Sequence, residues 1–283
     1  MLPRGGIFFY YEQINLNEET MKNLYKMTTA TCALAFALAF TACDDSTSAS
    51  DNGGNGGNGG ANAPCTDAIQ AQCPETLEAG TICDNRDGKI YKITTVGSQV
   101  WMAENLNYFS CNIKDASWCY KDKPENCDKY GRLYSWTAAM GIDKSYQTEY
   151  ANLTGVQRGN CPEGFHMPSE AEWSDFYDFV SNYAIEQSND EGAVVRAKGA
   201  WPNESYYPAT DDFGFAMLPA GEKSFTGYKE LGEKAFFWTA DEDHRDVVGS
   251  PRNVGIWTVS SMFGFGGGSL MKDEGISVRC IKD

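Results

Sequence analysis

The chain has 283 residues and a formal net charge of −16, with 23 basic and 39 acidic side chains. An acidic chain without a basic stripe binds nucleic acid and anionic membrane surfaces poorly, so the composition argues against nucleic acid as a partner. The same charge is typical of a protein that stays soluble outside the cell.

Residues 21–42 have the pattern of an export signal. Two lysines open the stretch, an apolar core runs from Thr28 to Phe40, and small residues lead to Cys43. As a helix, this core would span only about 20 Å, less than the roughly 30 Å hydrocarbon core of a bilayer, so we expect no transmembrane anchor.

The segment resembles a bacterial lipoprotein signal, in which Cys43 becomes the lipid-modified first residue. We therefore expect an exported protein that is anchored in a lipid bilayer through Cys43, at the outer membrane or the cell surface. Residues 1–20 contain three glutamates and fit badly before such a signal. Our hypothesis is that translation starts at Met21 and that residues 1–20 are a misassigned upstream extension.

Residues 43–64 form a tether after the signal. Repeated Asn-Gly-Gly triplets and almost no apolar side chains prevent this segment from burying a core. A flexible segment of this length has a root-mean-square span of about 25 Å, which holds a domain clear of a membrane. A cysteine-bearing segment over residues 65–84 follows, with a helical turn expected at Asp67–Gln72, and the main domain covers residues 85–283.

Cysteine usage indicates a disulfide framework. Of ten cysteines, Cys32 lies in the signal and Cys43 takes the lipid, which leaves an even number in an exported chain. The disulfide candidates are Cys65, Cys73, Cys83, Cys111, Cys119, Cys127, Cys161 and Cys280. Zinc is the alternative, but no C-x-x-C occurs and neither His166 nor His244 has ligand spacing to a cysteine. We predict no metal and no cofactor.

The main domain is predicted to be α+β. Two helices are expected early, over Tyr134–Met140 and from Ser169 to about Ile185, with a loop over Ser110–Lys129 before them. The expected strands are Lys89–Val96, Gln99–Asn105, Gly214–Pro219, Ala235–Ala240, Val254–Ser260 and Ile276–Ile281. Gly97-Ser98 is expected to join the first two strands as a tight turn.

The stretch Cys161–Trp173, CPEGFHMPSEAEW, organises this domain. Ser169 is placed as a helix N-cap with Glu172 three residues later, which is the pattern of a capping box. The following apolar residues recur at helical spacing: Trp173, Phe176, Tyr177, Val180 and Ala184. A catalytic pair of Glu170 and Glu172 is the alternative, but positions i and i+2 point to different sides of a helix, so a structural role is favoured.

Six ordered blocks resemble the Fibrobacter succinogenes major paralogous domain. The run Asp87–Tyr108 resembles its opening, and the six blocks follow the family's order and together cover nearly everything from Asp84 to Asp283. The later blocks are CDKYGRLYSWTAAM, CPEGFHMPSEAEW, FGFAMLPAG, FFWTA and GISVRCIKD. The resemblance implies an exported, often lipid-anchored protein of a Gram-negative bacterium.

HMPSEAEW together with the terminal SVRC is also similar, more distantly, to the formylglycine-generating-enzyme and C-type-lectin-like architecture. This resemblance implies two early helices packed on a twisted, loop-rich antiparallel β core whose first and last strands meet. It also implies a bridge between Cys161 and Cys280. Cys119 with Cys127 is a plausible bridge across a small loop, and the remaining pairings stay open.

The leading functional hypothesis is a non-catalytic binding module for a polysaccharide or a surface protein. Aromatic rings on the loops Gly199–Asp212 and Ser261–Asp273 could stack on sugars while nearby amides and carboxylates accept hydroxyl protons. The ligand-binding candidates are Trp201, Asn203, Tyr206, Tyr207, Asp211, Phe263 and Phe265. The alternative is that these rings pack beneath their loops. The carboxylates at Asp211 and Asp212 meet no calcium-ligand spacing, so no metal is predicted there.

Two further hypotheses are a structural subunit and an enzyme. A structural or assembly role in the outer envelope is expected if the loop aromatics are buried, whereas an exposed aromatic patch favours binding. Formylglycine-generating relatives use a reactive cysteine pair and copper, but here every mature cysteine can enter a bridge. The acidic run Asp241–His244 is interpreted as a solvated loop rather than acid–base machinery. We therefore expect no enzymatic activity.

Overall fold

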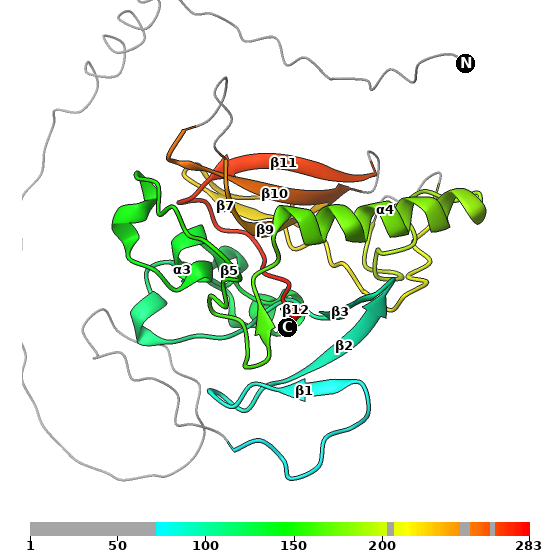
Figure 1. Ribbon diagram of the computed structural model, residues 1–283, viewed down its shortest axis with the longest axis horizontal. Helices are drawn as coiled ribbons and strands as arrows, with labels where there is room; N and C mark the ends of the chain where they lie inside the picture. The colour runs from blue at the N-terminus through cyan, green and yellow to red at the C-terminus, as the bar shows by residue number, and fades with distance from the viewer. Residues whose placement is uncertain (1–71, 203–206, 244–249, 261–263) are drawn as a thin grey trace, which may run out of the picture. The chain divides into compact units, whose positions relative to one another are not determined.

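The computed structural model describes residues 72–202, 207–243, 250–260 and 264–283 (Figure 1). The sequence predictions for Cys43, Cys65, Asn203, Tyr206 and Phe263 lie outside the described residues. So do the helical turn and the domain boundaries predicted before Gln72. Among the described residues, no helix is both long enough and apolar enough to span a bilayer.

The first sheet is built around the hairpin predicted at Gly97-Ser98. β2 (Ile90–Val96) and β3 (Gln99–Met102) pair antiparallel across this turn, where Gly97 has a φ of 61°, a left-handed conformation that favours glycine. The order β1-β2-β3-β12-β6 is completed by β1 (Thr81–Cys83), β6 (Phe165–His166) and β12 (Ile281–Lys282). The last strand of the chain therefore lies between β3 and β6 and does not pair with the first strand, β1.

The second sheet has the order β11-β10-β9 and is antiparallel throughout. β9 (Lys234–Glu242) and β10 (Asn253–Ser260) were predicted as strands, whereas β11 (Phe265–Met271) was predicted as a glycine-rich loop. That prediction is wrong because three glycines lower β-propensity without preventing backbone pairing with β10. Two small sheets pair β4 (Ser117–Trp118) with β5 (Leu133–Tyr134), and β7 (Glu222–Ser224) with β8 (Gly227–Lys229).

Helix α4 (Glu170–Glu186) connects the two large sheets. It contacts β2 of the first sheet and β9 and β10 of the second, and Figure 1 shows it lying along the second sheet. The predicted apolar positions are buried at Trp173, Phe176, Val180 and Ala184. The ring of Trp173 lies 4.6 Å from that of Trp101 and 5.5 Å from that of Phe237. One side chain therefore contacts strands of both sheets.

Of the two shorter helices, one starts later than the sequence predicts and the other is not predicted. α3 (Trp136–Met140) begins two residues later than predicted, because Ser135 is its N-cap and accepts a hydrogen bond from Ala138 N at 3.3 Å. α2 (Pro124–Tyr130) lies in the segment predicted as a loop. Its proline in the first turn is a helix-start signal that the sequence analysis did not use. Three 3₁₀ turns are η1 (Cys111–Ile113), η2 (Tyr120–Asp122) and η3 (Lys144–Gln147).

The predictions of two strands are largely wrong. Gly214–Pro219 forms no strand, because Gly214 and Ala216 have positive φ values of 64° and 53°, which break an extended ladder. In Ile276–Ile281 only the last residue belongs to a strand, β12. The rest crosses from the second sheet to the first and makes single bridges on the way, including Ile276 to Tyr134.

The buried side chain of Arg279 holds this crossing segment in place. Its guanidinium donates to Asn105 Oδ1 at 2.7 and 3.1 Å, to Met102 O at 3.2 Å and to Phe215 O at 2.5 Å. Burial lowers the pKa of Arg279 to about 9. Since an unpaired buried charge is costly, this hydrogen-bond network is needed to keep the segment in the core.

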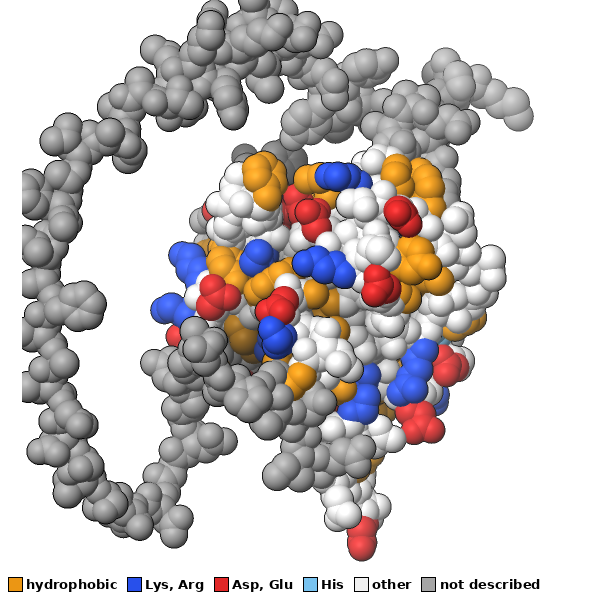
Figure 2. All heavy atoms as spheres, turned by 90° about the vertical axis from the view of Figure 1, so that its left-hand side faces the viewer, with side chains coloured by type: hydrophobic (Ala, Val, Ile, Leu, Met, Phe, Trp, Pro, Cys, Tyr) orange, Lys and Arg blue, Asp and Glu red, His pale blue; other side chains and the backbone are white. Residues whose placement is uncertain are grey.

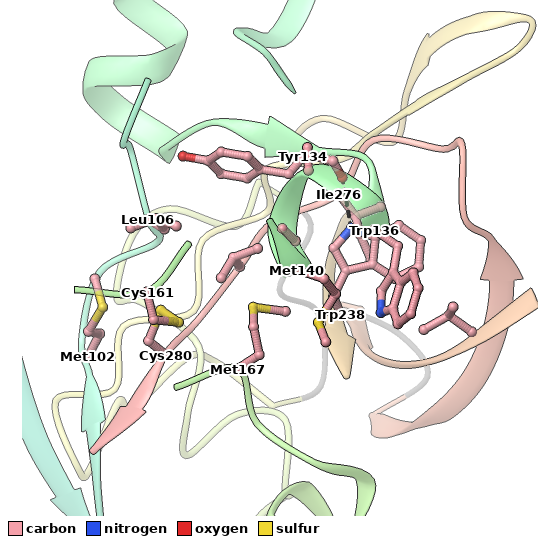
Figure 3. Packing of buried hydrophobic residues seen from close by; sticks show 14 of the residues in the cluster. Met102, Leu106, Tyr134, Trp136, Met140, Cys161, Met167, Trp238, Ile276 and Cys280 are labelled. Carbon is pink, nitrogen blue, oxygen red and sulfur yellow. Dashed lines mark hydrogen bonds between the residues drawn. A yellow bond between two sulfur atoms is a disulfide. The ribbon is translucent and has the colours of Figure 1, made fainter. Parts of the chain in front are cut away.

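The Cys161–Cys280 bridge lies in the hydrophobic core. Figure 3 shows it among Met102, Leu106 and Met167. Its Cα atoms are 5.9 Å apart, and the bridge closes a sequence separation of 119 residues. In the loop-entropy model such a long closure contributes about 4–5 kcal/mol to the free energy of unfolding.

The dashed line in Figure 3 is the hydrogen bond from Trp238 Nε1 to Tyr134 O, at 2.7 Å.

Disulfides also tie the early part of the domain. Cys119 and Cys127 are joined, with Cα atoms 4.9 Å apart, so both bridges named from the sequence are present. Cys73 is joined to Cys83, a pairing that the sequence left open. Cys111 is disulfide-bonded as well.

Candidate functional site

Two neighbouring hollows open beside the N-terminal end of α4. They have volumes of about 490 and about 540 Å³ and share Asp241 and Glu242, the last two residues of β9. The first hollow is otherwise lined chiefly by Leu153, Val156, Gln157, Met167, Ser169 and Ala240. The second is otherwise lined by Glu170, Asp243, Gly255, Gly267 and Gly268. We call the two hollows together the α4 cleft.

The start of α4 is fixed by the predicted capping box. Ser169 Oγ accepts a hydrogen bond from Glu172 N at 3.2 Å, and Glu172 Oε2 accepts one from Ser169 N at 2.8 Å. Burial alone would raise the pKa of Glu172, but hydrogen bonds from His166 and Ser169 outweigh it and lower the pKa. Glu172 is therefore a structural carboxylate, as the sequence predicts.

His166, which lines the first hollow, lies between two carboxylates. Its Nε2 is 2.8 Å from Glu172 Oε1, and its Nδ1 is 2.8 Å from Asp283 Oδ1. The hydrogen bond to Glu172 is the largest influence and raises the pKa of His166; burial opposes it, and Asp283 adds to it. A ring held at both nitrogens is suited to fixing the cleft wall rather than to exchanging protons with a ligand.

A bulge in β9 brings Asp241 to the helix. The register between β9 and β10 shifts between Val254 and Ile256, so residues of β9 bulge out opposite Gly255. Ala240 N then donates to Pro168 O at 2.7 Å, and Asp241 Oδ2 accepts from Glu170 N at 2.5 Å. A carboxylate at a helix N-terminus satisfies a free N–H and complements the helix dipole.

Glu242 is buried and forms an ion pair with Lys272. The side chain of Glu242 is 3% exposed and that of Lys272 is 0% exposed. Glu242 also accepts from Ala151 N at 2.9 Å and from Asn152 N at 2.8 Å. Lys272 Nζ donates to Tyr146 O at 3.0 Å and to Glu149 O at 2.8 Å, and it lies 4.7 Å from the centre of the Trp136 ring. The pair thus anchors the segment 146–152, which leads into the wall of the first hollow.

Asp241 is exposed, as expected of a solvated loop, but the loop predicted over Asp241–His244 is otherwise wrong for the residues that the structure describes. Asp241 and Glu242 end a strand, and Asp243 is buried; His244 lies outside the described residues. No local sequence pattern reveals this arrangement, because Lys272 lies thirty residues further along the chain. The acidic run is part of the scaffold of the cleft.

Two of the predicted ligand-binding aromatics belong to the core. Trp201 is 4% exposed and donates from Nε1 to Met217 O at 3.0 Å. Phe265 is 5% exposed, and its ring lies 5.1 Å from that of Trp257. This burial favours the alternative that the rings pack beneath their loops, because large rings gain much from burial in the core.

The remaining described candidates lie apart from the α4 cleft. Asp211 accepts from Ala216 N at 2.8 Å and stabilises a turn in which its own φ is 44°; burial raises its pKa. Tyr207 is 49% exposed and lines neither hollow of the cleft. Apart from the capping box and the acidic run, the residues that line it carry no local sequence signal, since they include exposed Leu153 and Val156 and four glycines.

A second exposed feature is the aromatic cluster of Phe179, Tyr183 and Phe213. The ring of Phe213 lies 5.6 Å from that of Phe179 and 4.8 Å from that of Tyr183. The interplanar angles are 56° and 61°, so the rings present no flat stacking platform. Phe179 is 41% exposed.

Metal binding finds no support in the described part of the chain. There, no group of three or more His, Cys, Asp or Glu side chains is arranged to hold a metal ion.

Comparison with known proteins identifies the family. A family model described as Fibrobacter succinogenes major domain matches residues 94–282, and the chain belongs to this family. Neither a curated protein nor a solved structure matches the chain. The C-type-lectin-like fold therefore stays a prediction, while the mixed, mostly antiparallel α+β architecture with disulfides is observed.

The contribution of His166 to stability depends on pH. Its folded-state pKa is raised, so the stabilisation is complete below the unfolded value of about 6.5 and is lost as pH rises through the folded value. Replacing His166→Gln is expected to lower the free energy of unfolding by about 2 kcal/mol at pH 5.5 and by clearly less at pH 9. Urea unfolding at both pH values measures this, and an equal loss at both would contradict the ion-pair assignment.

Breaking the buried ion pair should leave an uncompensated carboxylate. Lys272→Met is expected to lower the free energy of unfolding by about 3 kcal/mol. The double variant Lys272→Met with Glu242→Gln should recover part of that loss, because it also removes the unpaired buried charge of Glu242. Hydrogen exchange provides the local measurement: the amides of Ala151 and Asn152 should lose protection in both variants. Unchanged protection there would show that Glu242 does not anchor this segment.

Proposed function

We propose that this member of the Fibrobacter succinogenes major domain family is a non-catalytic binding module that holds a polysaccharide at the α4 cleft. The observation that carries the proposal is the pair of adjoining hollows, about 490 and 540 Å³, that meet at Asp241 and Glu242. Their walls are fixed by a helix cap, a carboxylate–histidine contact and a buried ion pair. A site formed before binding loses less entropy when the ligand arrives.

The lining of the cleft suits a neutral sugar chain. Leu153 and Val156 offer apolar surface to the C–H faces of a sugar, while the side-chain oxygen of Gln157 offers an acceptor for a hydroxyl. The carboxylates of the cleft and the net charge of −16 disfavour anionic polymers. On the face shown in Figure 2, basic side chains lie beside acidic ones rather than in a stripe, which also fits a partner other than nucleic acid.

The absence of catalysis is part of the proposal. Each ionisable group of the first hollow has a structural partner: Glu172 caps α4, His166 lies between two carboxylates, and Asp241 accepts from the helix backbone. Groups held in this way are poorly placed to exchange protons with a substrate. Six of the described cysteines are in bridges whose partners are also described, and Cys111 is bonded too.

Envelope attachment through Cys43 is proposed from the signal-like segment before it. A lipoprotein places its lipid on the first cysteine after cleavage, and the glycine-rich tether then separates the domain from the bilayer. The location proposed is the outer membrane or the cell surface.

A second candidate function is a structural or assembly subunit of the outer envelope. The burial of Trp201 and Phe265 favours it, because two of the rings that would have served binding instead stabilise the core. This candidate needs no ligand site.

Binding at the cleft is tested with matched surface variants. Leu153→Asn with Val156→Asn removes apolar surface from the first hollow and is expected to weaken binding at least about tenfold, equivalent to about 1.4 kcal/mol. Ile185→Asn is the control, since Ile185 and Val156 have similar exposures of 72% and 73% and Ile185 lies outside the cleft. Retention of the purified, disulfide-intact protein on insoluble cellulose and other plant-wall polysaccharides is the measurement.

Two outcomes would overturn the cleft assignment. If Phe179→Ala or Tyr207→Ala lost retention on the polysaccharide while Leu153→Asn with Val156→Asn kept it, the binding site would be assigned to the aromatic residues. Failure of the parent protein to bind any polymer would contradict the polysaccharide proposal and would favour the structural or assembly role.

Lipid anchoring makes a separate prediction. In cells supplied with a labelled fatty acid, the parent protein should carry the label and sediment with membranes. Cys43→Ala should lose the label and appear in the soluble fraction, while Cys32→Ala should keep both properties. Label retained in Cys43→Ala would contradict the assignment of the anchor.

A further inference from the structure

Among the described residues, the outer edge of β11 is open from Phe265 to Leu270. β11 pairs with β10 over seven residues and is the last strand of its sheet. In the described part of the chain, the backbone hydrogen bond on its other side is the one from Glu274 N to Met271 O, at 3.1 Å, at the C-terminal end of the strand. In a paired strand, every second residue directs its N–H and C=O away from the partner, so this edge presents a row of free donors and acceptors.

This edge also lacks the usual protection against strand pairing. Native edge strands are commonly guarded by charged side chains, proline or bulges. β11 reads FGGGSLM and contains no charged residue and no proline, and Gly267 and Gly268 are exposed. Glycine weakens a strand, and where it occurs in one it often marks a place where another backbone approaches closely.

A hollow adjoins β11 on each face of the sheet. Gly267 lines the second hollow of the α4 cleft, together with Glu170. Gly266 lines a different hollow of about 230 Å³, together with Phe236 and Thr258. Gly266 pairs with Thr258, and Thr258 pairs with Phe236, so these three residues face the side of the sheet away from Gly267 and Trp257. The backbone of Gly267 borders both hollows. A strand added at the edge would direct alternate side chains into the two hollows.

The hollow on the α4 side is acidic and contains unsatisfied polar groups. A Cβ atom at Gly267 would lie 3.7 Å from Glu170 Oε1 and 3.9 Å from Trp257 Cε2, the ring atom bonded to the indole nitrogen. Trp257 is 6% exposed, and its N–H has no hydrogen-bond partner among the described residues. The hydroxyl of Ser269, which pairs with Gly255 beside this hollow, is likewise buried without a partner there. Buried polar groups without partners are rare and indicate a place where a ligand could supply them.

We propose that β11 is a strand-addition site for an extended segment of another protein, with lysine or arginine at the positions that face α4. Glu170, Asp241 and Asp243 supply the complementary charge in that hollow. A second copy of this chain is a poor occupant, because its net charge of −16 repels it. This inference goes beyond the proposed function: it concerns a protein partner and the backbone edge, although the two sites share the second hollow.

The probe is the peptide Lys-Thr-Lys-Thr-Lys-Thr-Lys, fluorescently labelled and titrated with the disulfide-intact protein while anisotropy is recorded. Saturable binding is expected, with at least tenfold weaker binding of the matched glutamate–threonine peptide. Two further peptides carry N-methyl groups on every lysine or on every threonine. Because only one set of N–H groups can face β11, one methylated peptide should lose binding and the other should keep it.

Protein variants separate this proposal from the polysaccharide site. Gly267→Leu would fill the α4-side hollow at ordinary contact distances and should weaken peptide binding at least tenfold, whereas Leu153→Asn with Val156→Asn should leave it unchanged. No binding of the lysine–threonine peptide would overturn the proposal. Equal binding of both methylated peptides would also overturn it, since it would show charge attraction without strand pairing. Concentration-dependent dimerisation that is abolished by Gly267→Leu would assign the edge to a second copy instead.

Discussion

The carboxylate of Glu172 holds the arrangement on which the rest of the domain depends. It accepts hydrogen bonds from Ser169 N and Ser169 Oγ and contacts the buried ring of His166, which in turn reaches Asp283 at the end of the chain. This fixes where α4 begins. Trp173 is the next residue, is fully buried, and contacts aromatic rings from both large sheets. The position of a single helix cap therefore determines how the two sheets pack.

The α4 cleft follows from the same constraint. The bulge in β9 carries Asp241 to the first turn of α4 and leaves Glu242 buried against Lys272, which anchors the segment 146–152. The second hollow remains open beside these two residues because three glycines, Gly255, Gly267 and Gly268, line it without side chains. The carboxylates of this region act first as scaffold, and a ligand would meet a surface whose geometry is already set.

The sequence predicts the features that depend on residues close to one another along the chain. The Gly97-Ser98 hairpin, the Ser169–Glu172 capping box and the buried face of α4 all depend on residues within one or two turns of each other, and they are observed. The Lys272–Glu242 pair and the burial of Trp201 depend on contacts between distant segments, which no local pattern encodes. β11 was missed for a related reason, since its glycines form a strand only because β10 lies beside them. Sequence patterns therefore indicate the aromatic loops, whereas the cleft proposed as the site is lined mainly by small, polar and aliphatic residues.

Amide chemical-shift mapping of the protein with soluble cello-oligosaccharides and xylo-oligosaccharides tests the central claim most directly. The account predicts that the shifted amides cluster in residues 153–157, 167–172 and 240–243, which surround the α4 cleft. Shifts that gather instead around Phe179, Tyr183 and residues 207–213, or no shifts with any sugar, would contradict it.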